Sequence, residues 1–203
     1  MADNFNIPAG TGAVLRARDV GNDVKELIVS INGSTSSSSA LVAGEAHIGA
    51  VGGNTVEVNV TPTLTTHANY VSGDYVGTDA TPMTFAACAR VVGGTGTVIG
   101  AVLVDYATQG IAGELWLFDT LVTPPADSAA WTISDAHAAR CVGVIPFSTY
   151  YASVLNAVSP ASNLSIPFKA LAGATALYGC FVTRGAPTYA SGDLTFRLFI
   201  AQD

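Results

Sequence analysis

The sequence predicts an all-β protein, with a β-sandwich or jelly-roll-like body that follows an extended N-terminal arm. Short runs of strand-forming residues are separated by clusters of Gly, Pro, Asp and Asn at intervals of about 8 to 15 residues. The last run alternates in apolar character, because Leu194, Phe196, Leu198 and Ile200 share one face of an extended strand. Helical signals are confined to one short segment.

The arm comprises residues 1–31. Phe5, Ile7 and Pro8 form an extended lead-in, since proline biases the residue before it toward extended geometry. Residues 13–18 and 24–31 are predicted to be strands, joined by a turn at 19–23 that contains Gly and Asn.

Residues 32–54 contain a run of serines and predict a flexible linker between the arm and the body. A long surface loop within one domain is an equally good interpretation. The body then comprises residues 55–203, a length that fits one large domain.

Within the body, strands are expected at 55–60, 75–76, 83–87, 97–105, 114–118, 141–147, 165–168, 177–183 and 194–200. The strand at 97–105 has apolar residues on both faces, which predicts a central strand covered on both sides.

Two local motifs have a structural explanation. Ser134 is placed to cap a short helical turn over residues 135–140. The sequence Tyr-x-Ser-Gly-Asp occurs at 70–74 and again at 189–193, each time before a strand. We expect two equivalent turns, because Gly permits a positive φ and Asp can accept hydrogen bonds from its own turn.

The composition points to protein partners. Hydrophobic residues make up 49% of the 203 residues and charged residues only 11%, against about 25% in an ordinary soluble domain. A free monomer with so few charges would expose apolar patches, so much of the surface is expected to be covered by other subunits.

Charge and hydropathy disfavour other partners. The net charge is −7 and the few cations form no basic stripe, so no nucleic-acid binding is expected. No uninterrupted apolar segment of about 20 residues is present, so no membrane span is expected. The N-terminus lacks the apolar core of a secretory signal, which indicates synthesis in a reducing cytoplasm.

No catalytic, cofactor or metal site is predicted, and the chain is interpreted as a non-enzyme. The histidines are not at metal-ligand spacing from each other or from cysteine; they are His47, His67 and His137. The Gly-rich stretch 93–96 lacks the Lys-Ser/Thr of a phosphate loop and is expected to be a turn. The acids Asp119, Asp127 and Asp135 are expected to be solvated in loops.

The three cysteines, Cys88, Cys141 and Cys180, each lie in an apolar run and are expected to be buried, reduced thiols. Trp116 lies in a strong strand and is expected in the core. Trp131 is the better candidate for an anchor at a protein interface, where tryptophan is enriched.

From about residue 60 onward, several turn and strand motifs match a known pattern. They are Val-Thr-Pro-Thr at 60–63, the turn at 70–74, the stretch 93–105, Glu-Leu-Trp-Leu-Phe-Asp at 114–119, 132–136, 177–179, 184–189 and 191–198. In these motifs the chain resembles a family of small structural proteins of tailed bacteriophages, over roughly two-thirds of its length.

The resemblance implies a capsid decoration, or cement, protein that binds the major capsid protein on the head surface of the virion. A homotrimer is expected, because capsid lattices offer three-fold sites. Phe5, Ile7 and Pro8 of the arm, together with Trp131, are the partner-binding candidates. The alternative is a tail or head-fibre module that recognises host glycan through Tyr150, Tyr151 and Trp131.

Overall fold

The computed structural model describes residues 13–19, 25–31, 54–65 and 69–203. The chain divides into two units, residues 1–52 and 53–203. Phe5, Ile7 and Pro8 lie outside the described residues, as does the predicted linker except for Asn54.

In the first unit, β1 (Ala13–Asp19) pairs antiparallel with β2 (Lys25–Ile31). The two strands agree with those predicted at 13–18 and 24–31. The register places Leu15 opposite Val29 and Ala17 opposite Leu27.

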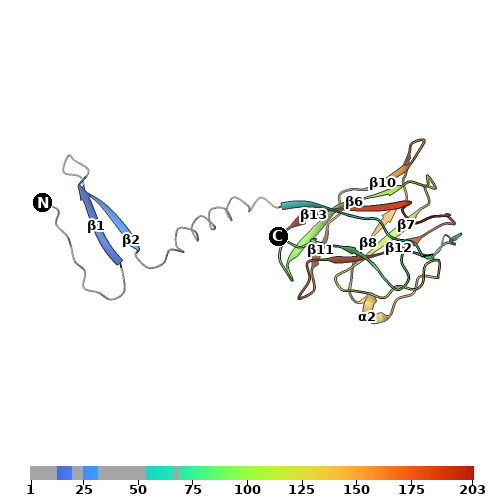
Figure 1. Ribbon diagram of the computed structural model, residues 1–203, viewed down its shortest axis with the longest axis horizontal. Coiled ribbons are helices and arrows are strands. Elements are labelled where there is room, and N and C mark those ends of the chain that lie inside the picture. The colour runs from blue at the N-terminus through green and yellow to red at the C-terminus, as the bar shows by residue number, and fades with distance from the viewer. Residues whose placement is uncertain (1–12, 20–24, 32–53, 66–68) are drawn as a thin grey trace. The chain divides into compact units, whose positions relative to one another are not determined.

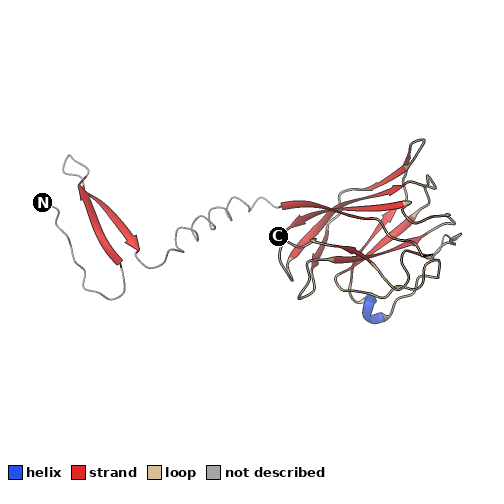
Figure 2. Cartoon of the chain, in the orientation of Figure 1, coloured by secondary structure: helices blue, strands red, loops and turns tan. Residues whose placement is uncertain are grey.

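The second unit is almost entirely β-structure, as predicted (Figures 1 and 2). Its strands are β3 (Asn54–Val60), β4 (Tyr75–Val76), β5 (Met83–Phe85), β6 (Thr95–Asp105), β7 (Gly113–Phe118), β8 (Cys141–Phe147), β9 (Tyr151–Ala152), β10 (Ala157–Ala161), β11 (Ile166–Lys169), β12 (Leu177–Thr183) and β13 (Leu194–Gln202). The short helix α2 (Asp135–Ala138) is capped as expected, because the Ser134 hydroxyl accepts from the His137 backbone N–H at 3.2 Å.

Within residues 54–65 and 69–203, the strands form two antiparallel sheets. Sheet 1 has the order β3-β13-β6-β10-β9, with β11 also paired to β6. Sheet 2 has the order β4-β12-β7-β8, with β5 also paired to β12. The chain passes repeatedly from one sheet to the other, so neither sheet can form without the other.

The core lies between the two sheets. Phe196 of sheet 1 contacts Phe181 of sheet 2, with ring centroids 5.0 Å apart, and Phe147 at 6.3 Å. The inner face of β13 is buried along its whole length, through Leu194, Phe196, Leu198 and Ile200. The predicted alternation of β13 is therefore confirmed.

Two strands, β9 and β10, were not predicted from the sequence. Pro160 lies in β10 opposite Val102, and a proline within a run argues against a central strand. It is tolerated here because β9 pairs only with Ala157 and Val158. The missing N–H of Pro160 therefore faces an open sheet edge.

The repeated Tyr-x-Ser-Gly-Asp motif forms two equivalent turns, as predicted. In the first, the Asp74 N–H donates to the Val71 carbonyl at 3.1 Å, and the Asp74 carboxylate accepts from the Val71 N–H at 2.8 Å. Asp193 and Ala190 repeat both contacts, at 3.1 and 2.7 Å.

The two turns are also neighbours in space. The tyrosines that open them, Tyr70 and Tyr189, are buried, and their ring centroids lie 6.2 Å apart. The glycines Gly73 and Gly192 have φ values of +98° and +93°, which L side chains rarely adopt.

We predict that Gly73→Ala and Gly192→Ala each lower the free energy of unfolding by about 1–2 kcal/mol. The cause is backbone strain alone, since nothing lies within 4 Å of a Cβ added at either position. Denaturant unfolding measures the effect. The exposed neighbour Ser72→Ala serves as the control, and an equal loss there would contradict the role of the positive φ.

Candidate interaction surface

Part of the face of sheet 1 that points away from the core is apolar and open to solvent. We call this part the outer face; by strand register it comprises Ile99, Val102 and Val104 of β6, Tyr151 of β9, Val158 and Pro160 of β10, and Phe199 of β13. Polar residues share the same side of the sheet: Thr195 and Arg197 lie opposite Val104 and Val102, and Glu57 and Asn59 lie opposite Phe199 and Arg197. Tyr151 is 68% exposed and Ile99 38%, and Pro160 is also exposed. The other four side chains are half-buried.

This face corrects the prediction for the strand at 97–105. The sequence indicated cover on both sides, but β6 is buried only through its inward residues, such as Val98, Ala101 and Leu103. Its outward residues are as apolar as those of a strand that is covered by a second layer. In the described part of the body, that layer is not present.

The few charges beside the outer face are neutralised locally. Arg197 of β13 forms an ion pair with Glu57 of β3, with Nη2 2.8 Å from Oε2. The Arg197 guanidinium also lies 5.7 Å from the centre of the Phe199 ring. The Arg197 hydrogen bond holds the pKa of the exposed Glu57 carboxyl below its usual value.

A groove crosses the outer face where β10 ends. It has a volume of about 370 Å³ and is lined by Ile99, Gly100, Val102, Pro160, Ala161 and Phe199, with Ala101, Ser162 and Asn163 also at its boundary. The register of β13 on β6 shifts between Phe199 and Ile200, beside this groove. Gly100 supplies a wall without a side chain, which leaves room for an apolar group.

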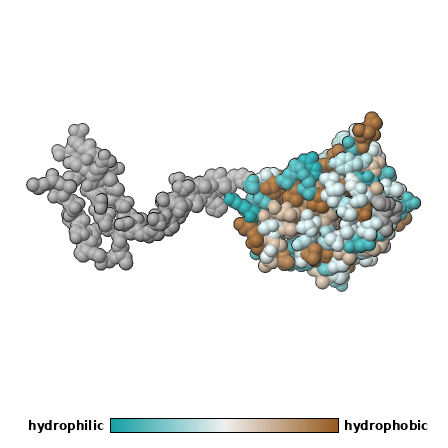
Figure 3. Space-filling view, viewed as in Figure 1, coloured by the Kyte–Doolittle hydropathy of each residue, from teal (hydrophilic) through white to brown (hydrophobic). Residues whose placement is uncertain are grey.

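The hairpin between β9 and β10 carries two apolar residues at its end. We call Val154 and Leu155 the hairpin tip; they are 94% and 77% exposed. The brown protrusion of Figure 3 lies at the place of this hairpin, which is orange in Figure 1. The two central positions of a tight turn normally carry Gly, Asn, Asp or Pro, so Val-Leu here is a departure from turn chemistry.

The turn beneath the tip is well ordered by hydrogen bonds. The Ser153 N–H donates to the Asn156 carbonyl at 2.7 Å, and the Ser153 hydroxyl lies 3.3 Å from the N–H groups of both Leu155 and Asn156. The apolar pair is thus held in place rather than frayed.

Sheet 2 differs, because a segment of the same chain covers part of its outward side. Residues 119–140 cross over β4, β12 and β7, and bury Tyr75, Phe118 and Cys180 together with the segment's own Val122. The Asp119–Arg140 ion pair, at 2.8 Å, joins the two ends of this crossing segment.

Trp131 anchors the crossing segment. Its ring stacks on Tyr75, with centroids 6.0 Å apart, and contacts Trp116 at 5.8 Å. The expectation that Trp116 belongs to the core is wrong. Trp116 is half-buried on the outward side of sheet 2, while Leu115 and Leu117 of the same strand point inward.

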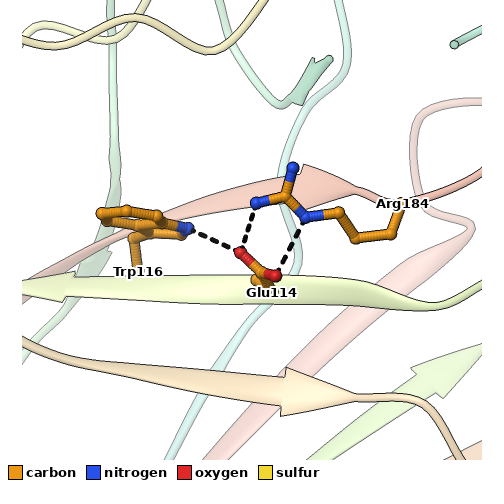
Figure 4. A network of polar contacts seen from close by, with 3 residues as sticks. All are labelled: Glu114, Trp116 and Arg184. Carbon is orange, nitrogen blue, oxygen red and sulfur yellow. Dashed lines mark hydrogen bonds and ion pairs between the residues drawn. The ribbon is translucent and has the colours of Figure 1, made fainter. Parts of the chain in front are cut away.

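Trp116 also belongs to a polar network at the surface (Figure 4). Its indole N–H donates to Glu114 Oε2 at 3.3 Å, and Arg184 Nε donates to Glu114 Oε1 at 2.9 Å. A second Arg184 nitrogen, Nη2, donates to Oε2. The Arg184 hydrogen bonds lower the pKa of Glu114, so the pair is charged near neutral pH.

The structure does not bring together the aromatic residues proposed for glycan binding. Trp131 lies over sheet 2, whereas Tyr151 lies on the outer face of sheet 1. Tyr150 packs against the main core, and its hydroxyl donates to the Ile111 carbonyl at 2.7 Å. Burial raises the pKa of Tyr150 above its usual value, so it remains a neutral phenol.

Two buried carboxylates near the turns are engaged within the chain. Asp127 was expected to be solvated, but it is buried and accepts from the Tyr70 hydroxyl at 2.9 Å. Asp105 is also buried, and accepts from the N–H groups of Ala107 and Gly110 at 2.9 and 2.8 Å. These carboxylates satisfy loop backbone, as structural carboxylates do.

Residues 54–65 and 69–203 contain no cluster of three or more His, Cys, Asp or Glu that could hold a metal ion. No helix in the described part of the chain is long and apolar enough to cross a membrane. The first half of the Gly-rich stretch 93–96 is a turn, as expected, with the Gly94 N–H donating to the Val91 carbonyl at 2.9 Å, whereas Thr95 and Gly96 already belong to β6.

No protein-family model, no curated protein and no solved structure matches this chain.

The thiols provide a test of the crossing segment. All three cysteines are free; Cys88 and Cys180 are buried, and Cys141 is half-buried. Burial raises the pKa of Cys180 to about 12 and that of Cys88 to about 11, so both are neutral and slow to react at pH 8.

We predict that Trp131→Ala costs about 2 kcal/mol of stability, less than the ~3–5 kcal/mol of a fully buried aromatic residue. It should also increase the rate of Cys180 labelling, measured by thiol modification and peptide mass spectrometry, while Cys88 stays protected. Leu121→Ala, in the same segment but at a residue 61% exposed, is the control. Unchanged protection of Cys180 would show that Trp131 does not hold the segment down.

Proposed function

We propose that the chain is a structural protein of a tailed-phage virion, a decoration protein that packs its outer face against neighbouring subunits on the head. The observation that carries the proposal is the open apolar face of sheet 1, on a strand whose sequence is that of a doubly covered strand. The phage-like motifs in residues 60–198 supply the setting. In this role the chain binds protein and carries out no reaction.

The free energy available from burying the outer face indicates that the protein needs a second attachment. The strands β6, β13, β10 and β9 have 11, 9, 5 and 2 residues; at about 4.8 Å between strands and about 3.3 Å per residue they present roughly 400 Å² in projection. Part of this area is polar, so at ~25 cal/mol per Å² its burial contributes at most about 10 kcal/mol, against an association cost of ~4–15 kcal/mol. One such contact is weak, so stable attachment requires several contacts acting together.

The N-terminal hairpin is suited to be that second contact. A two-stranded hairpin is marginally stable in water by itself. The register of β1 on β2 pairs apolar residues with one another, as at Leu15–Val29 and Ala17–Leu27, and paired positions share one face of a ribbon. We infer that the major capsid protein covers this face and that residues 1–31 form the attachment arm.

The number of copies per particle tests the proposed role. Quantitative mass spectrometry of purified virions should find hundreds of copies, close to the number of capsid subunits. A handful would place the protein in the tail or in a fibre, and none would refute a virion role.

Deleting residues 1–31 should lower binding to heads that lack the protein by at least roughly tenfold, while the body unfolds with unchanged cooperativity. Co-sedimentation with such heads measures binding. In the intact chain, Leu27→Asp should act like the deletion, whereas Ser30→Asp, at a position paired with Val14, should not. Full binding by the deleted protein would exclude the arm as an attachment.

A further inference from the structure

The hairpin between β9 and β10 ends in an exposed apolar pair, and the groove that β10 helps to line is a recess that would accept such a pair. We propose that the hairpin tip of one copy, Val154 and Leu155, inserts into the groove of a second copy, and that the second copy's tip inserts reciprocally into the first. This inference rests on the packing role proposed for the outer face, and it names the partner as the chain itself.

The exposed hairpin tip supports this pairing. Val154 and Leu155 replace the usual turn residues at the most exposed position of a hairpin that Ser153 and Asn156 hold in shape. A local rule broken at an ordered and exposed position indicates a functional reason. Because the tip is already ordered, its insertion would cost little conformational entropy.

The lining of the groove also supports this pairing. Apolar side chains of Ile99, Val102, Pro160 and Phe199 line it, together with Gly100. The three atoms nearest to a Cβ added at Gly100 are Phe199 Cδ2, the Ala161 carbonyl oxygen and Phe199 Cβ, at 3.5, 3.6 and 3.9 Å. These are ordinary van der Waals distances, so the groove has room for an apolar group beside Gly100.

The position of the two features favours a two-fold pair. Both belong to β10 and its flanks, with Leu155 and Pro160 about 17 Å apart along an extended strand. A two-fold axis midway between them places each tip over the other copy's groove, as an isologous interface requires. This arrangement favours a dimer over the trimer that capsid symmetry suggests.

Charge and area permit a second copy at this face. The body carries 5 basic and 10 acidic residues, a net charge of 5 − 10 = −5, so most approaches of two copies are repulsive. Beside the outer face, Glu57 is paired with Arg197, which lowers the repulsion there. Two faces of roughly 400 Å² with their tips bury about 1,000 Å² in total, near the lower limit for a specific interface. A dissociation constant in the micromolar range is expected.

The test uses the full-length chain in solution. Sedimentation velocity and light scattering over a concentration series should show a monomer–dimer equilibrium. Val154→Asp/Leu155→Asp should weaken association at least roughly tenfold, and Gly100→Leu should do the same by filling the groove. Leu121→Asp, at an equally apolar and exposed site on the crossing segment, should leave association unchanged.

A cross-linking experiment reports the contact itself. An equimolar mixture of a Leu155→Cys chain and an Asn163→Cys chain should give a linked pair with a bismaleimide, while either chain alone and the wild-type chain should not. A wild-type chain that stays monomeric, a trimer, or a dimer unaffected by the tip and groove variants would each overturn the proposal. A wild-type chain that binds heads without self-associating would overturn only this inference, and a wild-type chain that self-associates through the tip and groove but does not bind heads would overturn only the capsid role.

Discussion

The contact of Phe196 with Phe181 joins the two sheets, and most of the body depends on it. Phe196 lies on β13, which pairs with both β3 and β6, and Phe181 lies on β12, the centre of sheet 2. Each sheet has one apolar inner face that only the other can cover, so the two fold as one cooperative unit. The turns at Tyr70 and Tyr189 support this arrangement, because they order the chain where β4 and β13 begin and pack against each other.

The two sheets differ in how much of their outward side is covered by other parts of the chain. Sheet 2 is covered in part by residues 119–140, held by Trp131 on Tyr75 and joined at the ends by Asp119 and Arg140. Sheet 1 has no such cover among residues 54–65 and 69–203, although β6 is as apolar as a buried strand. The low charge content of the chain thus coincides with an uncovered apolar patch on sheet 1.

Much of the fold could be predicted from local pattern. The strands β4, β8 and β12 begin and end where alternation and turn residues placed them, and the helix cap at Ser134 followed from its side chain. The side of the strand on which Trp116 lies was predicted wrongly. Leucine and tryptophan alternate along this strand, so either of its two faces could have been the inward one. Glu114 shares the parity of Trp116, and this charged residue is the signal that marks the outward side.

Other features could not be predicted because they depend on contacts distant in sequence. Asp127 is buried only because Tyr70 and Gly77, about 50 residues away, donate to it. The strand β10 is short and contains Pro160, so its existence depends on pairing with β6 rather than on its own propensity. The groove arises from that same pairing, which is why no motif indicated it.

The mismatch between sequence and cover on β6 has a thermodynamic consequence. Selection for solubility alone would place polar residues at the outward positions of β6, as it does on β3 with Thr55, Glu57 and Asn59. Valine and isoleucine at those positions leave the monomer with an apolar surface that water solvates poorly. Burial of such a surface against another protein would release free energy roughly in proportion to the apolar area covered. A face of this size gives a contact that is weak singly and strong only when several such contacts act together.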